Sequence, residues 1–562
     1  MAELRISVWR YLGAASAFSA FLATQAPAAD CSQQPPDSDF LIEKLVSGSP
    51  QGDAMDLDIA KDGRVFWTER TTQKLQVYEP KSKTVAVIHT FSPDQVMSEN
   101  TNYEGNGNEG GLQGMALDGN FANNHFVYIY YTAKVANFAK GALGPIERLS
   151  RFTLTENDSK LDVNSEIKLL EHKIYAQCCH HGGDVEWGAD GNLWLSTGDN
   201  TSLTYNDDGV PINDDNVKLD ARSGTANTNS YRGKILRIHP EAAQQTDGKW
   251  YTIPRGNLFP AGTAKTLPEI YSMGHRNPYS IQIDSRFHGD ATHPWVLDGE
   301  AGPAKGTDEV NLIKAPGFFG WPFLNRDNFS MGTSHYVAEA IVNNSQFNTG
   351  IQNLPAAQPA LAWFGAGGSS GHGISGCVPG AGPFMRFDST LNSAVKFPPW
   401  FNDKVILFSG WGDSYWVGKL SDQGVLSEVK KIFSTSLGGS VLRIKRGPDG
   451  ALYSISNGGG YFVPAGGDKI FKISYKGTCN PPPISVSLER TRALSGFNAK
   501  RPMLAQIHAG ATLLLPAGVL GIELYTPAGK KVWSYERRHL ELDEGVTAPT
   551  GLGQGLYSIR YY

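Results

Sequence analysis

The segment QCCHHGG, residues 177–183, places two cysteines, two histidines and two glycines in seven consecutive positions. An imidazole titrates near neutral pH and can remove a proton from a substrate. The cysteines and histidines could instead bind a zinc ion, but the ligands of a tetrahedral zinc site usually come from separated pairs of cysteine or histidine. Taken alone, adjacent loop histidines are more typical of a structural hydrogen-bonded pair. The residue types therefore leave a base, a zinc site and a structural loop to be weighed against the rest of the chain.

Three further polar clusters interrupt the apolar segments. They are EGGLQG at 109–114, GHRNPYS at 274–280 and DGEAGPAKGTDEVNLI at 298–313. Arginine can stabilise developing negative charge, and loop carbonyls and carboxylates are the oxygen ligands that calcium prefers. Each cluster by itself is more typical of a solvated loop. Their meaning depends on whether the fold brings them together.

The region between residues 40 and 475 predicts strands almost throughout. DIAKDGRVFWTE, EWGADGNLWLSTGD and IKRGPDGALYSISN share one plan, in which an Asp-Gly turn joins two apolar strands. Asp-Gly is typical of two-residue hairpin turns. Recurring hairpins without a long amphipathic helix predict an all-β fold, a β-propeller of about six blades with about 65 to 75 residues each. Ligands of propellers sit where loops converge on the axis, so the four polar clusters are the candidate site.

The composition argues against one class of partner. The chain has 562 residues and a formal charge of -5, from 50 basic and 55 acidic residues, with no long basic run. Nothing in this balance favours binding to a phosphate backbone. We therefore expect no nucleic-acid partner.

The two ends of the chain predict a leader and a separate module. Two arginines, an apolar run over residues 11–22 and a small-residue stretch over 26–29 predict a signal peptide at 1–29. We therefore expect export to the periplasm, the medium or the cell surface, without a transmembrane segment. Residues 30–479 are expected to form the propeller, and 480–562 predict a small β-sandwich behind a proline-rich linker. Its ending is similar to modules that bacteria use for surface sorting or attachment; a passive cap is the alternative.

Export would favour disulfides among the five cysteines. Cys31 and Cys479 bracket the propeller, so a bridge between them would tie the two ends of that domain together. The remaining three leave two alternatives, a bridge between Cys178 and Cys179 or a bridge from one of them to Cys377.

The motifs together resemble one protein family. EGGLQGMALDGNFANNHFVYIYYT, CCHHGGDVEWGADGNLWLSTGDN, YRGKILRIHP, MGHRNPYSIQID, AGPAKGTDEVNLI and GFFGWPF follow one another as in the soluble glucose/sorbosone dehydrogenases. The resemblance covers roughly residues 40–475 and is closest to exported members with a CCHxGG motif. It implies a six-bladed propeller that uses pyrroloquinoline quinone and calcium to oxidise sugars.

The resemblance implies roles for individual residues. His180 occupies the general-base position of the family's H-x-G-G motif, and His181 lies beside it at the variable position in the substrate pocket. Arg276, also expected to be catalytic, and Asn277 match residues that contact the quinone oxygens. Glu109 falls where relatives carry a polar residue that faces the substrate pocket.

The calcium site that the resemblance implies lies in the fourth cluster. Gly302 and Pro303 match positions whose backbone carbonyls bind the catalytic ion. Asp308 and Glu309 match acidic positions that in relatives help to hold a second, structural calcium. As a Lewis acid, the catalytic ion would polarise the quinone carbonyl that accepts hydride.

Two arginines and several tryptophans complete the expected site. Arg386 and Arg443 are expected to bind the cofactor. Arg443 and Lys445 lie one residue out of the family's usual spacing to GPDG, and a one-residue slip turns a strand side chain to the other face. Three tryptophans could stack on a sugar, with packing between blades as the alternative: Trp363, assigned to the substrate pocket, Trp411 and Trp416.

These assignments predict an enzyme that oxidises an aldose or related sugar. Hydride would pass to the quinone while His180 removes the hydroxyl proton, and an external acceptor such as a cytochrome c or a membrane quinone would then take the electrons. Two other functions stay open from the sequence. One is a propeller that binds a sugar or a protein without catalysis, and the other is a calcium-dependent sugar-lactone hydrolase.

Overall fold

A computed structural model gives the architecture of the chain. It describes residues 31–47, 53–97, 109–135, 143–176, 179–201, 210–289, 292–303, 306–332, 334–365, 368–376, 378–410, 414–433, 440–457 and 469–479, together with the strands 503–507, 512–515, 521–525, 531–536, 544–547 and 555–561. The predicted signal peptide lies outside these residues. Among the helices that are described, none is long and apolar enough to cross a membrane.

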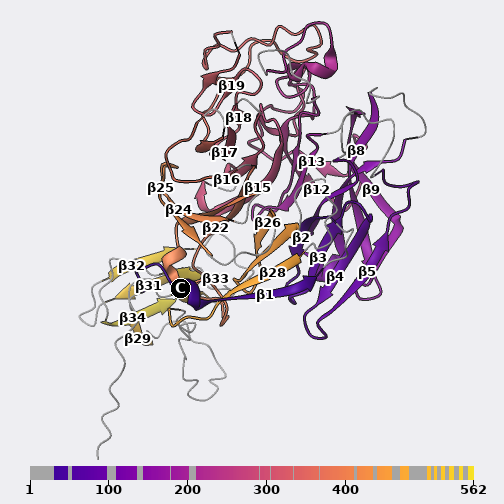
Figure 1. The fold of residues 1–562 in the computed structure, drawn as a ribbon. Helices are drawn as coiled ribbons and strands as arrows, with labels where there is room; N and C mark the ends of the chain where they lie inside the picture. Colours follow the sequence, from indigo (N-terminus) through magenta and orange to yellow (C-terminus); the bar gives the residue numbers. More distant parts are fainter. Residues whose placement is uncertain are drawn as a thin grey trace, which may run out of the picture.

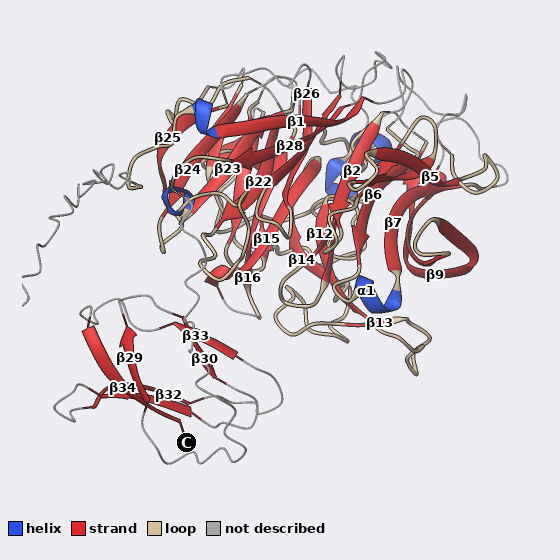
Figure 2. Ribbon diagram, turned by 90° about the horizontal axis from the view of Figure 1, so that it is seen from below, coloured by secondary structure: helices blue, strands red, loops and turns tan. Residues whose placement is uncertain are grey.

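Six sheets form a six-bladed β-propeller, which confirms the predicted all-β class and architecture (Figures 1 and 2). Blade 1 consists of β2 (Ala54–Ile59), β3 (Val65–Glu69), β4 (Lys74–Glu79) and β5 (Thr84–Thr90), and blade 2 of β6 (Leu112–Leu117), β7 (Phe126–Ala133), β8 (Leu143–Thr155) and β9 (Lys160–Tyr175). Blade 3 consists of β10 (Gly182–Trp187), β11 (Leu193–Thr197), β12 (Lys234–Pro240), β14 (Ile270–Met273) and β18 (Gly317–Phe318), with β13 (Tyr251–Thr252) paired to β12. Blade 4 consists of β15 (Pro278–Gly289), β16 (Pro294–Glu300), β17 (Asp308–Ile313) and β21 (Ala362–Phe364).

The last two blades complete the ring. Blade 5 consists of β22 (Pro379–Met385), β23 (Lys404–Ser409), β24 (Tyr415–Leu420) and β25 (Leu426–Ile432), and blade 6 of β26 (Ser440–Arg446), β27 (Leu452–Asn457), β28 (Lys469–Tyr475) and β1 (Phe40–Ser47). The remaining elements of this region are short: α1 (Phe121–Asn124), the 3-10 turns Asp37–Asp39, Val217–Leu219, Ala221–Ser223 and Pro399–Phe401, and the paired strands β19 (Leu324–Asn325) and β20 (Phe329–Ser330).

Blade 6 closes the propeller with strands from both ends of the region. β1 pairs antiparallel with β28, and Figure 1 shows indigo β1 beside orange β28. Cys31 and Cys479 form a disulfide with a Cα–Cα distance of 5.3 Å, as predicted. The disulfide therefore ties the N-terminal and C-terminal ends of the propeller together covalently within blade 6, where β1 and β28 are already paired in the sheet.

The three Asp-Gly hairpins are present, but their turns are longer than predicted. β2–β3, β10–β11 and β26–β27 pair antiparallel. In each turn only the glycine takes a positive φ, 90° at Gly63, 76° at Gly191 and 77° at Gly450. A two-residue turn with Asp-Gly at its centre would require positive φ at both residues, so these are longer loops with glycine in the left-handed position.

Apolar packing lies between the blades, as expected when each sheet must bury both faces against its neighbours. Six clusters of buried apolar side chains each join one pair of adjacent blades. Trp416 of β24 belongs to the cluster between blades 4 and 5 and is 4% exposed. Trp416 therefore packs between blades, which is the alternative to stacking on a sugar. Trp411 lies outside the described residues.

The innermost strands all run in the same direction, which gives the propeller a defined entry end where these strands begin. Paired contacts show this for β2 and β6, where Met115 N donates to Asp56 Oδ2 and Leu117 N donates to Asp58 Oδ2, each at 2.9 Å. They show it also for β10 and β15, where Gly182 N donates to Asn277 Oδ1 at 3.0 Å and Gln282 Nε2 donates to Glu186 Oε1 at 2.7 Å. The clusters at 109–114 and 274–280, and residues 179–183 of the histidine cluster, lie at the starts of inner strands. Glu300, opposite Pro278 in the sheet, brings the fourth cluster to the same end.

The C-terminal region contains strands of its own. β29 (Met503–Ile507), β34 (Gly555–Tyr561), β31 (Gly521–Tyr525) and β32 (Lys531–Glu536) form one sheet in that order, and β30 (Thr512–Leu515) pairs with β33 (Glu544–Thr547). Two small antiparallel sheets agree with the β character expected there. The sandwich itself and its boundary at residue 480 stay predictions.

Candidate active site

His180 is held by a buried carboxylate at the entry end of blade 3. Its Nδ1 lies 2.7 Å from Asp199 Oδ1, and the two side chains are 4% and 0% exposed. Within the described part of the chain, Nε2 of His180 makes no hydrogen bond. The carboxylate thus favours the tautomer with a proton on Nδ1, which leaves Nε2 as the proton acceptor.

Asp199 is ionised and well anchored. Its Oδ1 also accepts a hydrogen bond from the backbone of Thr201 at 2.9 Å, and its backbone N–H donates to the Arg276 carbonyl at 2.8 Å. Burial acts to raise the pKa of Asp199, but the charge and hydrogen bond of His180, helped by Arg276, lower it overall. Asp199 was not predicted from the sequence. The sequence feature that could have indicated Asp199 is its position two residues after β11, the strand that pairs with β10 just beyond the two histidines.

His181 forms a second histidine–carboxylate pair. Its Nδ1 lies 2.6 Å from Glu147 Oε1 on β8, and both side chains are 1% exposed. Thr132 Oγ1 donates to the same carboxylate oxygen at 3.0 Å. Burial acts to raise the pKa of Glu147, but the charge and hydrogen bond of His181 lower it. This pair ties the histidine loop to the sheet of blade 2, and Glu147 was likewise not predicted.

Glu109 anchors the backbone of both histidines. Its Oε2 accepts hydrogen bonds from the backbone N–H of His180 at 2.8 Å and of His181 at 3.1 Å. The residue is only 5% exposed. The structure therefore places Glu109 against the histidine loop, where it joins the first polar cluster to the second.

Two glycines allow the loop its conformation. His180 has a φ of 66°, unusual for a residue with a side chain, and Gly182 follows with 66°. A Cβ atom on Gly198 would lie 1.9 Å from the His180 carbonyl oxygen. Glycine at 198 is thus required for the end of β11 to approach the loop that presents His180.

The HRNP turn links the histidine loop to the fourth cluster. Asn277 Oδ1 accepts a hydrogen bond from Gly182 N at 3.0 Å. Arg276 N donates to Glu300 Oε2, and Arg276 Nη1 donates to the Ala301 carbonyl, each at 2.7 Å. Arg276 and Asn277 are 6% and 7% exposed. A buried guanidinium and amide therefore lie close to the predicted base.

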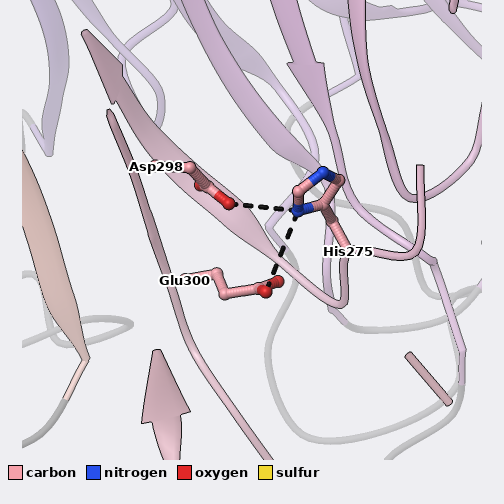
Figure 3. Close-up of side chains that lie close together, drawn as sticks. All are labelled: His275, Asp298 and Glu300. Atoms are coloured by element: carbon pink, nitrogen blue, oxygen red, sulfur yellow. Dashed lines mark ion pairs between the residues drawn. The ribbon is translucent and has the colours of Figure 1, made fainter. Parts of the chain in front are cut away.

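A buried histidine and two carboxylates support this turn (Figure 3). His275 Nδ1 lies 3.1 Å from Asp298 Oδ2 and 3.9 Å from Glu300 Oε1. Burial alone would lower the pKa of His275, but the hydrogen bonds and charges of the two carboxylates raise it to about 9. One ligand atom from each residue lies within 4.8 Å of the others, a spacing that could hold a metal ion. The same three residues form a buried ion-pair group, because the raised pKa of His275 favours its protonated form beside the two carboxylates.

The predicted calcium carbonyls lie in a tight loop after β16. Of the bonds that the described residues make, none reaches the Gly302 carbonyl, whereas the Pro303 carbonyl accepts one from Gly306 N at 2.9 Å. A Cβ atom on Gly302 would lie 1.9 Å from the Thr307 carbonyl oxygen. The loop thus offers one carbonyl oxygen without a donor and a second with a spare lone pair.

The acidic pair after this loop is engaged by the protein itself. Asp308 Oδ1 accepts from Gly302 N at 2.7 Å, and Oδ2 accepts from Val378 N at 2.8 Å. Glu309 Oε1 accepts from Asn325 Nδ2 and from the backbone of Arg326. Both carboxylates therefore anchor neighbouring backbone or side-chain groups of the protein.

Arg443 and Lys445 both reach the propeller axis. Arg443 Nε lies 3.5 Å from Asp56 Oδ1 and 3.6 Å from Asp184 Oδ1, while Lys445 Nζ lies 3.0 Å from Asp56 Oδ1. The register of β26 shifts between Val441 and Arg443, which marks a β-bulge. From Arg443 to Arg446 the pairing with β27 is regular, so Arg443 and Lys445 lie on the same face of β26, and their contacts show that this face points to the axis.

Two expected site residues are not brought to the histidine loop. Arg386 is exposed and follows the last residue of β22, so it lies at the end of the propeller opposite to the entry end. Trp363 lies on β21, the outermost strand of blade 4, opposite Glu309. The expectation that Arg386 binds the cofactor is therefore corrected, because the direction of β22 places this residue at the opposite end of the propeller. Trp363 lies far from the axis because β21 is the outermost strand of its blade.

Cys179 immediately precedes this site and is disulfide-bonded. Its backbone is buried next to His180, so a covalent link here would restrain the loop. The two partners predicted for it, Cys178 and Cys377, lie outside the described residues.

Comparisons with known proteins agree with this fold and motif order. Residues 52–363 match the family model for glucose/sorbosone dehydrogenase. Quinoprotein glucose dehydrogenase B of Acinetobacter calcoaceticus is 25% identical over 283 residues, which are 50% of this chain and 52% of that protein. The chain thus spans about half the length of this curated relative.

Solved structures share the propeller. The soluble aldose sugar dehydrogenase of Escherichia coli has a TM-score of 0.51 and 17% identity over 78% of this chain and 99% of its own. An oxidoreductase of Thermus thermophilus, described as a glucose dehydrogenase, has a TM-score of 0.50 and 21% identity over 77% of this chain and 99% of its own. Because the family model covers more than half of the 562 residues, the chain belongs to the glucose/sorbosone dehydrogenase family.

Proposed function

We propose that this protein oxidises an aldose or a related sugar, with pyrroloquinoline quinone and calcium as cofactors and His180 as the general base. One observation carries the proposal: the buried His180–Asp199 pair, whose Nδ1–Oδ1 distance is 2.7 Å, lies against the turn that presents Arg276 and Asn277. Family membership and the quinoprotein relative supply the cofactor class.

The residues at the entry end fit these cofactors. Pyrroloquinoline quinone is a tricarboxylate, and the buried cations Arg276 and Arg443 offer charge complementarity to it. Arg443 Nε makes no hydrogen bond within the described residues. The Gly302 carbonyl, equally without a donor there, is the hard oxygen that calcium prefers. Arg276, Asn277 and Arg443 would therefore hold the quinone, and the carbonyls of Gly302 and Pro303 the ion.

When bound, the quinone and calcium supply a polarised carbonyl that accepts hydride. His180 performs the complementary step by accepting the sugar hydroxyl proton at Nε2, while the same carbon loses its hydride. Asp199 holds the ring in the productive orientation and stabilises the imidazolium that results. Arg276 places a positive charge beside the negative charge that develops.

The second half of the reaction requires an external acceptor. We propose a cytochrome c or a membrane quinone, together with export of the protein and surface attachment through residues 480–562. The Cys31–Cys479 disulfide supports an oxidising compartment.

A reconstitution experiment tests the proposal. Apoprotein freed of metal with a chelator is titrated with quinone in the presence and absence of calcium, and binding is followed by tryptophan fluorescence. A panel of aldoses is then added with a redox dye. We expect dye reduction only when quinone, calcium and a sugar are all present.

Three results would overturn it. Quinone binding without reduction by any sugar, or no quinone binding at all, would identify a propeller that binds a sugar or protein without catalysis. Turnover of sugar lactones without quinone would identify a calcium-dependent hydrolase.

A further inference from the structure

The segment after β17 returns from blade 4 to blade 3. There β18 pairs parallel with β14, with Phe318 opposite Met273. Trp321 N donates to the Gly274 carbonyl at 3.1 Å, just before the HRNP turn. A Cβ atom on Gly274 would lie 2.5 Å from the ring of Phe318, so glycine permits this close approach. The backbone of Trp321 is therefore fixed relative to the active-site turn.

The indole of Trp321 reaches the carboxylate that holds the base. Its Nε1 donates to Asp199 Oδ2 at 2.8 Å, while Oδ1 of the same carboxylate serves His180. Trp321 is 3% exposed and Asp199 is fully buried. Asp199 Oδ2 therefore accepts from the indole, while Oδ1 contacts the imidazole and accepts from the backbone of Thr201.

A neutral donor has a particular advantage at this position. A carboxylate with one oxygen unbound can rotate and weaken its bond to the histidine. A lysine or arginine bonded to Oδ2 would fix the carboxylate but would also neutralise part of its charge. The indole N–H donates one hydrogen bond and carries no net charge, so the carboxylate keeps its charge for the imidazolium.

We propose that Trp321 is a positioning residue, the third member of a Trp321–Asp199–His180 relay that sets the orientation and the proton affinity of the base. The inference deepens the proposed function, and its kinetic test rests on that function. The residue acts through Asp199.

Trp321→Phe removes the donor and keeps an aromatic ring. Trp194→Phe is the matched control, because Trp194 Nε1 also donates to a buried aspartate, Asp190 Oδ1, at 3.3 Å. Trp194 is fully buried too, but Asp190 lies in the β10–β11 turn, at the end opposite to His180. Urea unfolding of both variants identifies any loss that comes from stability alone.

Kinetics of the reconstituted holoenzyme give the first readout. Trp321→Phe should lower kcat about tenfold, the size expected for one hydrogen bond to a charged group, and leave KM for the sugar within about twofold. Trp194→Phe should leave kcat unchanged. In an Asp199→Asn background, Trp321→Phe should have little further effect, because the two residues act as one unit. Equal kcat losses in the two tryptophan variants, or fully additive losses with Asp199→Asn, would overturn the inference.

A second readout does not depend on activity. In apoprotein labelled with 15N-histidine, the Nδ1–H signal of His180 is identified by its loss in His180→Gln. Trp321→Phe should move this signal, whereas Trp194→Phe should not. An unmoved signal in Trp321→Phe would refute the relay. If the wild-type holoenzyme oxidises no sugar but the signal moves, the proposed function fails and the relay stands.

Discussion

His180 and His181 are neighbours in the chain, and each is paired through Nδ1 with a buried carboxylate. The distances are nearly equal, 2.7 Å to Asp199 and 2.6 Å to Glu147. Their backbone N–H groups even share one acceptor, Glu109 Oε2. In both pairs the histidine lowers the pKa of its carboxylate against the effect of burial. By local chemistry alone the two residues could not be told apart.

The surroundings of the two pairs differ. Asp199 contacts Trp321 and Arg276, at the turn that carries the predicted cofactor contacts. Glu147 belongs to β8 and contacts Thr132 within the sheet of blade 2. One pair therefore faces the expected reaction, and the other holds the loop to the scaffold. The partners of the two carboxylates, rather than the histidine–carboxylate contact itself, distinguish His180 from His181.

The largest effect should come from removing the proposed base. His180→Ala should reduce the turnover of the reconstituted enzyme about a thousandfold, within the usual range for general-base catalysis. Quinone binding, measured by fluorescence, should persist because Arg276, Asn277 and Arg443 are unchanged. Full turnover in this variant would remove the distinction between the two histidines.

A third buried histidine extends the comparison to pH. The pKa of His275 is raised from its ordinary value of 6.5 to about 9 by Asp298 and Glu300, which outweigh its burial. The folded state therefore binds a proton more tightly than the unfolded state. The resulting stability is fully present below about pH 6.5 and is lost as the pH rises towards about 9, by up to about 3 kcal/mol.

Urea unfolding at a series of pH values measures this dependence. Asp298→Asn removes one carboxylate and should flatten the fall between the two pH values. His239→Gln, at an exposed position on β12, is the control. Stability that stays constant from pH 6.5 to 9 in the wild type would contradict a protonated His275.

Matched changes in the two carboxylates test the assignment of the pairs. Asp199→Asn should lower kcat about a hundredfold, because an amide no longer stabilises the imidazolium. Glu147→Gln makes the same replacement in the other pair and should change kcat far less. Steady-state kinetics decide the matter, and equal losses in the two variants would mean that both histidines act in the reaction.

The smallest effect on turnover should come from the second histidine. His181→Gln should change kcat by less than about tenfold, since the residue is assigned to anchoring. It should lower the free energy of unfolding by about 1 to 3 kcal/mol, because Glu147 loses its buried partner. Urea unfolding and kinetics on one preparation separate the two effects. A large loss of kcat at unchanged stability would assign His181 to the substrate.

Local patterns in the sequence were enough for much of the fold. Alternating apolar residues and the Asp-Gly turns predicted the hairpins, because side-chain alternation and the positive φ of glycine act within a few residues. The predicted length of the Asp-Gly turns was wrong, because a longer loop needs only one residue, the glycine, in the left-handed conformation. The positions of Cys31 and Cys479 at the two ends of the propeller region predicted the disulfide that the structure contains.

The candidate site was predictable only in part. Motif order identified His180, Arg276 and Asn277, which the structure brings together at the entry end. Arg386 was misplaced, because the short segment GPFMRF does not reveal at which end of a blade its strand finishes. Arg443 is out of the family's usual spacing to GPDG, and only its contacts with Asp56 and Asp184 show that it reaches the axis.

The sequence by itself determined the strands, their turns, the order of the family's motifs and the residue types capable of proton transfer. Only the tertiary structure decided which carboxylate serves which histidine. Asp199 lies 19 residues from His180, Glu147 lies 34 from His181, and Trp321 lies 122 from Asp199. Such pairings depend on how the blades close and on strand register, and no local pattern encodes distances between side chains that the ring alone brings together.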